Sequence, residues 1–192
     1  PLAPDRFPDM PAIAGLGLAT AASGLKYTGR DDMLLMHCDK GSSIAAVFTK
    51  SDTAAAPVQW SRDALASGHP PAAILVNAGN ANAFTGKQGY KSLEKIAEQL
   101  SQELTNKQKI DEDTPKKIKS KEIMFGCTGT IGEMFPEQKI KNKITELIKN
   151  IKYTQNKYIW MKAALAIMTT DTQPKMAMEN CKIGGCSVKI FG

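Results

Sequence analysis

The amino-acid sequence predicts an α/β (α+β) fold, a layered sandwich of mixed sheets and helices. Along its 192 residues, short apolar runs alternate with amphipathic helical patterns, and the order strand, glycine-rich turn, helix recurs. An early pair of apolar runs has the spacing of a β-hairpin, which argues against a purely parallel sheet. With 42% hydrophobic residues the chain can bury one sizeable core, so we expect residues 1–192 to form a single domain.

The first half of the chain contains signals for a hairpin, a helix and a buried strand. The apolar runs 33–36 and 44–48 flank the turn-forming residues 39–42 and predict the hairpin. A helical pattern over 58–66 follows a proline and stops before a glycine and two further prolines. The compact apolar run 72–76 predicts a buried strand that leads directly into an asparagine-rich loop.

The second half is expected to hold three helices and a final strand. Residues 89–105 carry apolar side chains on one helical face, and the polar, lysine-rich stretch 106–121 is predicted to be a surface loop. A second amphipathic helix is expected over 136–151 and a third over 158–167. The alternating segment 187–191 predicts a strand at the end of the chain, which suggests that more polypeptide completes this fold.

The formal net charge is +6, and its distribution decides what it indicates. Residues 87–157 contain 15 lysines against 10 acidic residues, interleaved on helical faces, and no arginine. Nucleic-acid binding favours arginine and aromatic side chains, so we interpret the lysines as a solvated surface and expect no nucleic-acid partner. No apolar stretch approaches membrane-spanning length and residues 1–10 lack a signal-peptide pattern, so we expect a cytoplasmic protein without membrane contact.

The familiar catalytic and metal-binding motifs are absent from the sequence. His37 and His69 adjoin no nucleophile motif, and there is no phosphate-binding glycine loop. The four cysteines and two histidines lack zinc-type spacing, so we expect no metal site and name no cofactor. The cysteines are expected to be reduced, largely buried thiols.

Three polar segments, each placed directly after an apolar element, remain as candidates for chemistry: 77–86, 126–132 and 169–175. In the second segment, Thr128 places a hydroxyl beside the Gly129 amide, so the pair could hold a developing negative oxygen or could form a plain turn. The asparagines of the first segment could scaffold their own loop or contact a substrate. The threonines of the third could cap a helix or bind a ligand.

Taken together and in this order, the three segments resemble the ornithine acetyltransferase (glutamate N-acetyltransferase) family. The family pattern Asn-x-Gly-Asn-Ala-Asn-Ala, followed by Thr-Gly, matches 77–83 and 85–86. Thr-Gly-x-Ile-Gly matches 128–132, and Met-Thr-Thr-Asp-Thr-x-Pro-Lys matches 168–175. Each motif alone is weak, but their joint order is specific.

Two further elements extend the resemblance over nearly the whole chain. Gly24-Leu25-Lys26 is similar to an early Gly-Ile-Lys of the family, and 55–58 to its Ala-Pro-Val element. Cys127 and Thr130 depart from the serine and valine that are common in relatives. Both replacements are small side chains and should leave the backbone turn intact.

The resemblance implies the N-terminal α chain of a precursor that cleaves itself before a threonine located beyond Gly192. That threonine would begin the β chain, complete the fold and act as nucleophile, with its own α-amine as base, which fits the missing serine–histidine or cysteine–histidine pair. The implied reaction transfers acetyl from N2-acetylornithine to glutamate through an acyl-enzyme, in an α2β2 heterotetramer. Thr128 and Gly129 would form the oxyanion hole and Thr172 would bind substrate. Use of acetyl-CoA as a second donor, and the role of Lys175, stay open.

Two other functions also stay open at this point. A self-processing aminopeptidase of related fold would use the same kind of nucleophile and release an amine to water, although the 169–175 signature favours the transferase. A basic binding module without catalysis would bind polyanions in a strongly salt-dependent manner.

Overall fold

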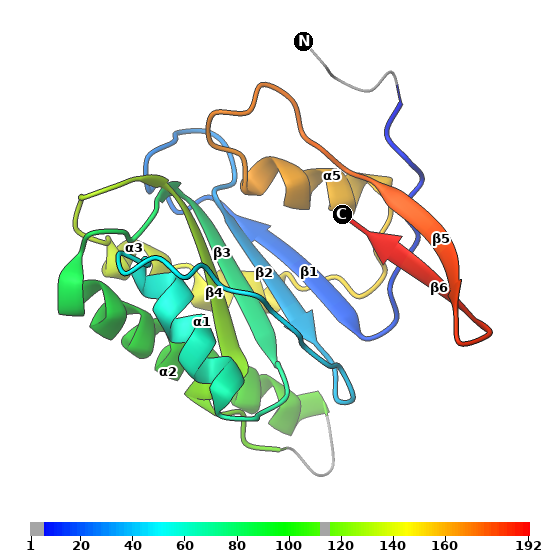
Figure 1. Cartoon of the computed structure of the whole chain (residues 1–192), viewed down its shortest axis with the longest axis horizontal. Coiled ribbons are helices and arrows are strands. Elements are labelled where there is room, and N and C mark those ends of the chain that lie inside the picture. Colours follow the sequence, from blue (N-terminus) through cyan, green and yellow to red (C-terminus); the bar gives the residue numbers. More distant parts are fainter. Residues whose placement is uncertain (1–5, 112–115) are drawn as a thin grey trace.

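The computed structural model describes residues 6–111 and 116–192, and its centre is a four-stranded mixed sheet in the order β1-β2-β3-β4 (Figure 1). The strands are β1 Leu16–Ala21, β2 Met33–Cys38, β3 Ala73–Asn80 and β4 Ile123–Thr130. The first three are antiparallel neighbours, whereas β3 and β4 run parallel with a helix between them in sequence. This arrangement confirms the predicted mixed α/β class.

Helices cover both faces of this sheet (Figure 1). One face carries the larger core, which takes side chains from four helices: α1 Ala56–Ala66, α2 Gly86–Asp111, α3 Glu137–Lys141 and α4 Ile144–Lys149. The other face packs against α5 Lys157–Ala166, and a separate hairpin, β5 Met178–Ile183 and β6 Cys186–Phe191, contacts α5 in turn. There the rings of Trp160 and Phe191 stack with centroids 5.5 Å apart.

Helix α1 also provides hydrogen-bond partners for backbone groups along the outer edge of β4, which is an edge strand of the sheet. The indole N–H of the fully buried Trp60 donates to the Ile123 carbonyl at 2.8 Å. The Ser61 hydroxyl accepts the Phe125 N–H at 3.2 Å and lies 3.3 Å from the Phe125 carbonyl. Burial of a side chain as large as Trp60 contributes about 1.5–3 kcal/mol, so this contact anchors the strand that carries the candidate site.

The predicted helix over 89–105 is confirmed, but α2 is longer at both ends and absorbs the first residues of the stretch expected to be a loop. Lysine and glutamine are good helix formers, so the chain after Thr105 continues the helix to Asp111. Residues 112–115 of the predicted loop lie outside the described residues. After this gap the chain again contacts α2, where the Ile118 N–H donates to the Thr105 hydroxyl at 2.9 Å. The short 3₁₀ helix η1 Ser120–Glu122 then leads into β4.

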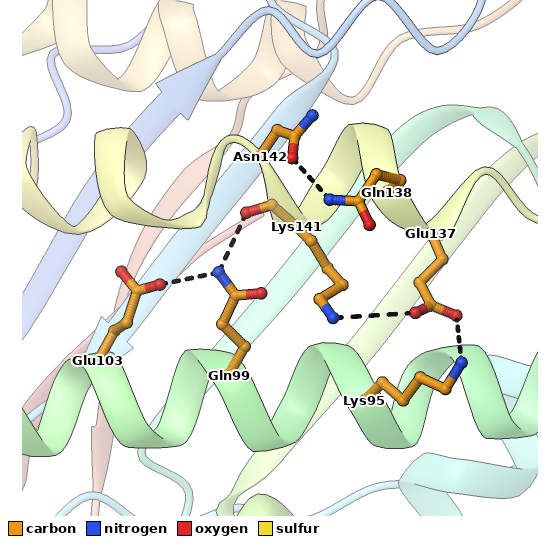
Figure 2. Close-up of polar contacts among 7 residues, drawn as sticks. All are labelled: Lys95, Gln99, Glu103, Glu137, Gln138, Lys141 and Asn142. Atoms are coloured by element: carbon orange, nitrogen blue, oxygen red, sulfur yellow. Dashed lines mark hydrogen bonds and ion pairs between the residues drawn. The ribbon is translucent and has the colours of Figure 1, made fainter.

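The expected single helix over 136–151 is wrong, because it is divided into α3 and α4 at Asn142 and Lys143. Figure 2 shows that at this break the Gln99 side chain on α2 donates to the Lys141 carbonyl at 3.2 Å, a carbonyl that an uninterrupted helix would use in its own hydrogen-bond ladder. On the same surface Glu137 contacts Lys95 at 3.4 Å and Lys141 at 3.9 Å. The lysines here are paired with acids on helix surfaces, as the interleaved pattern suggested.

The predicted hairpin between 33–36 and 44–48 is also wrong in its second strand. β2 forms, but its two hydrogen-bonding edges are occupied by β1 and β3, which leaves no edge for a third strand. Residues 42–50 have no regular structure, and Val47 is 99% exposed. The apolar run 44–48 therefore lies outside the sheet. The strand that pairs with β2 in its place, β1, was not predicted.

The remaining elements agree with expectation more closely. α1 and α5 lie within two residues of the predicted ranges 58–66 and 158–167, and β6 contains the predicted strand 187–191. Its antiparallel partner β5 was not predicted, and Gly184 and Gly185 form the turn between them, both with positive φ. None of the helices within the described ranges is long and apolar enough to cross a membrane.

Candidate active site

Two of the three polar segments meet at one end of the sheet, where β3 and β4 finish side by side. The parallel register pairs Ala78 with Thr128, Gly79 with Gly129 and Asn80 with Thr130. Both segments had been expected to be loops, but their first halves continue the strands. Carboxyl ends of parallel strands gather at one edge of a sheet, and that edge is where α/β proteins commonly build their sites.

Gly129 and Gly79 allow the two strand ends to approach more closely than side chains would permit. Both have positive φ, +133° for Gly129 and +123° for Gly79. A Cβ on Gly129 would lie 2.3 Å from the Gly79 carbonyl carbon and 2.6 Å from the Asn80 nitrogen, which is a backbone overlap. Only glycine fits at this crossing, so Gly129 is required for the close approach of the two strands.

The asparagines hold the loop after β3 in place. Asn77 donates to the Asn80 carbonyl at 2.8 Å, and the Asn80 side-chain oxygen accepts the Asn82 N–H at 2.8 Å. Asn82 has φ +48° and bonds both Gly89 and Thr85 through its amide. Because each of these buried side chains is used within the loop, the structure supports the scaffolding interpretation of 77–83.

The loop is also tied to the chain that follows β4. The Ala81 N–H donates to the Thr130 carbonyl at 2.9 Å, and the Gly132 N–H donates to the Ala83 carbonyl at 2.9 Å. The Asn80 amide reaches the carbonyls of Glu133 and Met134, both at 3.3 Å. The loop after β3 and the chain after β4 are therefore joined by several hydrogen bonds on the C-terminal side of Thr128 and Gly129.

Thr128 and Gly129 present two hydrogen-bond donors in this setting. The Phe125 N–H points away from β3 towards Ser61, so alternation along the strand directs the N–H of Gly129, four residues on, to the same outer edge. The side chain of Thr128 is half-buried, and its hydroxyl makes no hydrogen bond to any residue in the described part of the chain. A hydroxyl and an amide of adjacent residues can together hold one oxygen atom.

The Thr128 side chain also lies on the side of the sheet that faces α5. A Cβ on Gly126 would contact the Val76 side chain at 3.4 Å, and Val76 packs against the core that contains α5. Thr128 follows Gly126 by two residues, so strand alternation points it to that same side. The segment 169–175 leaves the end of α5, which brings it to the same side of the sheet.

Cys127, which directly precedes Thr128 on β4, is not a nucleophile in this arrangement. Its side chain packs against the larger hydrophobic core. Burial raises the pKa of the Cys127 thiol well above its usual range, so the thiol stays protonated at neutral pH. Cys127, Cys38 and Cys181 are half-buried and Cys186 is exposed, so the expectation of largely buried thiols is wrong for Cys186.

The segment 22–32 lies next to the ends of β3 and β4. From the sequence, only the similarity of residues 24–26 to a family element had marked this segment. Asp32, fully buried, accepts hydrogen bonds from the N–H groups of Ser23 at 2.6 Å and Leu25 at 2.9 Å. The following Lys26 donates from Nζ to the Thr130 hydroxyl at 3.1 Å. An acidic residue directly before an apolar strand was the available signal for this anchor.

Thr172, the expected substrate-binding residue, is exposed in the stretch between α5 and β5. No hydrogen bond joins it to Thr128 or Gly129 within residues 6–111 and 116–192. The helix-cap alternative for 169–175 is wrong, because the segment follows α5 and precedes a strand. Lys175 bonds Asp171, and this hydrogen bond lowers the pKa of the Asp171 carboxyl.

The segments are connected through Arg30. Its guanidinium lies 3.8 Å over the Tyr27 ring and donates to the Met168 carbonyl, at the start of the Thr172 segment. The segment 22–32 therefore contacts both the Thr128 strand end, through Lys26, and the Thr172 segment, through Arg30.

Comparison with curated proteins shows close relatives over the whole chain. The arginine biosynthesis bifunctional protein ArgJ of Nitrobacter winogradskyi is 40% identical over 195 aligned residues, which cover 100% of this chain and 43% of that protein. The protein of the same name from Agrobacterium fabrum is 41% identical, with 100% and 42% covered. The chain thus spans about two-fifths of the length of these relatives.

Solved structures give a similar result. A crystal structure of arginine biosynthesis bifunctional protein ArgJ from Bacillus halodurans superposes with a TM-score of 0.76 at 27% identity and covers 93% of this chain and 84% of that chain. Ornithine acetyltransferase of Mycobacterium tuberculosis, crystallised with ornithine, superposes with a TM-score of 0.75 at 30% identity, covering 85% and 80%. The model of the ArgJ family matches residues 17–192, nearly the full length, and with these relatives it establishes that the chain belongs to the ArgJ family.

Proposed function

We propose that this chain is the N-terminal α part of an ornithine acetyltransferase and that Thr128 and Gly129 form its oxyanion hole. The observation that supports this most directly is the rigid, glycine-dependent crossing of β3 and β4, which holds an unbonded hydroxyl next to an amide. In this proposal residues 1–192 form one domain, and the nucleophilic threonine comes from the remaining part of the protein.

The chemistry assigned to the pair is stabilisation of negative charge. The threonine hydroxyl attacks the acetyl carbonyl of N2-acetylornithine while its α-amine takes the proton, and the carbonyl oxygen becomes an oxyanion. The Thr128 hydroxyl and Gly129 N–H bind that oxyanion until the C–N bond breaks and ornithine leaves with the proton. The α-amine of glutamate then attacks the acyl-enzyme ester and forms a second oxyanion at the same place. When this intermediate collapses, the C–O bond to the threonine breaks, the proton of the attacking amine passes through the threonine α-amine to the threonine oxygen, and N-acetylglutamate leaves.

Chain lengths support division of the protein into two pieces. The chain covers 42–43% of the curated relatives but 80–84% of the matching chains in crystals. Those crystal chains are therefore close to this chain in size, as expected if a longer precursor is cut into separate α and β chains. We infer an α2β2 assembly in the cytoplasm with N2-acetylornithine and glutamate as substrates.

The proposal is tested by Thr128→Ala in the full-length protein. Loss of one oxyanion donor typically costs about 10²–10³-fold in rate, so acetyl transfer from N2-acetylornithine to glutamate should fall by about that factor. Thr128→Ser keeps the hydroxyl and should retain most of the rate, while the circular dichroism spectrum of both variants stays that of the parent. A parent protein that hydrolyses peptides without transferring acetyl would instead support an aminopeptidase.

Thr172 has a separate test. If its exposed side chain binds substrate, Thr172→Ala should raise KM with little change in kcat. Unchanged kinetics would remove Thr172 from the proposed site.

A further inference from the structure

We propose that one face of the β5–β6 hairpin is the docking surface for an apolar layer of the remaining part of the protein, the polypeptide outside residues 1–192. The inference rests on the proposed function, in which this chain is one part of a longer precursor. Figure 1 shows the hairpin at one side of the molecule, where β5 and β6 form a two-stranded sheet separate from the four-stranded one. An isolated two-stranded hairpin is marginally stable at best, so its stability depends on what packs against it.

The inward face of the hairpin packs against the rest of the chain at the open end of the hairpin. Met178 and Phe191 are opposite each other in the register, and both pack against the core that contains Trp160 of α5. The positive-φ residues of this region are the two turn glycines, so the alternation of side chains along each strand is uninterrupted. The other side chains of the inward face are polar: Asn180, Lys182, Ser187 and Lys189.

The outward face of the hairpin is the apolar one. By the same alternation it carries Glu179 at the open end and then five apolar or thiol side chains: Cys181, Ile183, Cys186, Val188 and Ile190. Ile183 is 63% exposed, Ile190 is 52% exposed, and Cys186 is exposed as well. The other two are opposite each other in the register and are half-buried. Within the two described ranges, neither hydrophobic core includes any of the five.

An exposed apolar face of this kind indicates a missing layer. Sheets in layered folds bury their apolar face against a second layer and expose their polar face. In the hairpin the apolar face is the exposed one, so its cover does not come from the described residues of this chain. The covering layer must itself be apolar, because the outward face offers a single charge, Glu179, at its open end.

The size of the outward face favours the remaining part of the same protein over a second copy of this chain. Six-residue strands are about 20 Å long and a pair of strands is about 10 Å wide, which gives the face an area of about 200 Å². A stable interface between separate proteins buries about 800 Å² on each partner, so two copies in contact only here would not hold together. Polypeptide of the same precursor is covalently attached while it folds, so a small face suffices as one part of its contact.

The relatives contain enough additional polypeptide to form such a layer. The curated relatives match this chain over 42–43% of their length, so more than half of each relative lies outside the match. The ArgJ family model extends through both strands of the hairpin to residue 192. The hairpin thus belongs to the part of the chain that the family model describes.

The test measures the accessibility of Cys186 in the folded full-length protein, with Lys149→Cys on α4 as a reference thiol at an exposed position. After brief treatment with iodoacetamide, the tryptic peptide 183–189 reports on Cys186 alone, because trypsin cuts after Lys182 and Lys189. Each rate is divided by the rate of the same thiol in urea. If the remaining polypeptide covers the outward face, this ratio should be at least about 10-fold lower for Cys186 than for the reference.

Charge substitutions separate the outward face from a general effect on the hairpin. Ile190→Asp places a carboxylate on the outward face, and Asn180→Asp places the same charge at an exposed position of the inward face. Ile190→Asp should raise the reactivity of Cys186 by about 10-fold and release the covering layer at a urea concentration about 1 M lower. Asn180→Asp should behave as the parent.

Several outcomes would overturn the docking surface. Cys186 that reacts as fast as the reference would do so, as would equal protection of Cys186 in Ile190→Asp and Asn180→Asp. Protection that disappears on dilution would assign the face to a second copy of the chain instead. Failure of Ile190→Asp alone to fold would support the proposal, because Ile190 is exposed within this chain. Acetyl transfer is measured on the same samples: protected Cys186 without transfer would overturn the proposed function and leave the docking surface in place.

Discussion

Replacement of Gly129 by alanine tests whether the candidate site depends on backbone contact between β3 and β4. The new Cβ would lie 2.3 Å from the Gly79 carbonyl carbon, and Gly129 has φ +133°. A non-glycine residue in such a conformation costs about 1–3 kcal/mol. Overpacking against atoms that cannot move adds about another 1–3 kcal/mol, so Gly129→Ala should destabilise the protein by about 2–6 kcal/mol.

Two neighbouring glycines provide matched controls for Gly129→Ala. Gly132 has φ +81° with open space around it, so Gly132→Ala should show the conformational cost alone, about 1–3 kcal/mol. Gly126 is not in the positive-φ region and its Cβ would make an ordinary 3.4 Å contact with Val76, so Gly126→Ala should change stability by less than about 1 kcal/mol.

The assay is urea unfolding followed by tryptophan fluorescence. Trp60 is fully buried and bonded to β4, so its emission reports on the strand that contains the substitution. The reasoning is refuted if Gly129→Ala is no more destabilising than Gly132→Ala. That result would mean that β3 and β4 separate easily and that the oxyanion pair is not held rigidly.

Three further predictions concern other parts of the molecule. Asp32→Ala leaves the partly buried N–H donors of Ser23 and Leu25 without their acceptor and should lower stability by about 2–4 kcal/mol in urea unfolding. The loss should be larger than for Asp32→Asn, which keeps one carbonyl oxygen, and equal losses would contradict this. Burial, followed by the 2.6 Å hydrogen bond to Asp63, raises the pKa of Tyr90 to about 12, so its contribution to stability is complete below pH 10 and is lost as pH rises towards 12; Tyr90→Phe should flatten this fall in alkaline unfolding curves. Cys127 should resist iodoacetamide at neutral pH in the folded protein and react after unfolding in guanidinium, as mass spectrometry can show; rapid modification of the folded protein would contradict its assignment as a protonated core thiol.

The elements predicted best were those with a strong local signal. The periodicity of 89–105, the small and apolar composition of 158–167, and the proline and glycine limits of 58–66 each predicted a helix that forms, although α2 extends beyond 89–105 at both ends. β1 and β5 were missed because their short, mixed sequences show little apolar alternation. The run 44–48 has strand-like composition but no free strand edge to pair with, and a pairing partner is not a local property.

The same distinction applies to the candidate site. Thr128, Gly129 and Thr172 were identified through the resemblance of their motifs, whereas Lys26 entered only as part of a weak family element. Its contact with Thr130 joins residues 104 positions apart, and no spacing rule predicts such a contact. At the break between α3 and α4, the Lys141 carbonyl likewise accepts a hydrogen bond from Gln99 on another helix, a contact 42 positions apart in sequence.

The sequence by itself determined the mixed α/β class, the three long or well-delimited helices and the order of motifs that marks the family, because these depend on residue types and on spacing along the chain. Only the tertiary structure decided that β3 and β4 end in register, that Gly79 and Gly129 touch, and that Lys26 lies beside Thr130. Those contacts follow from which strands pair and how closely their backbones approach, and strand pairing is settled by packing of the whole chain.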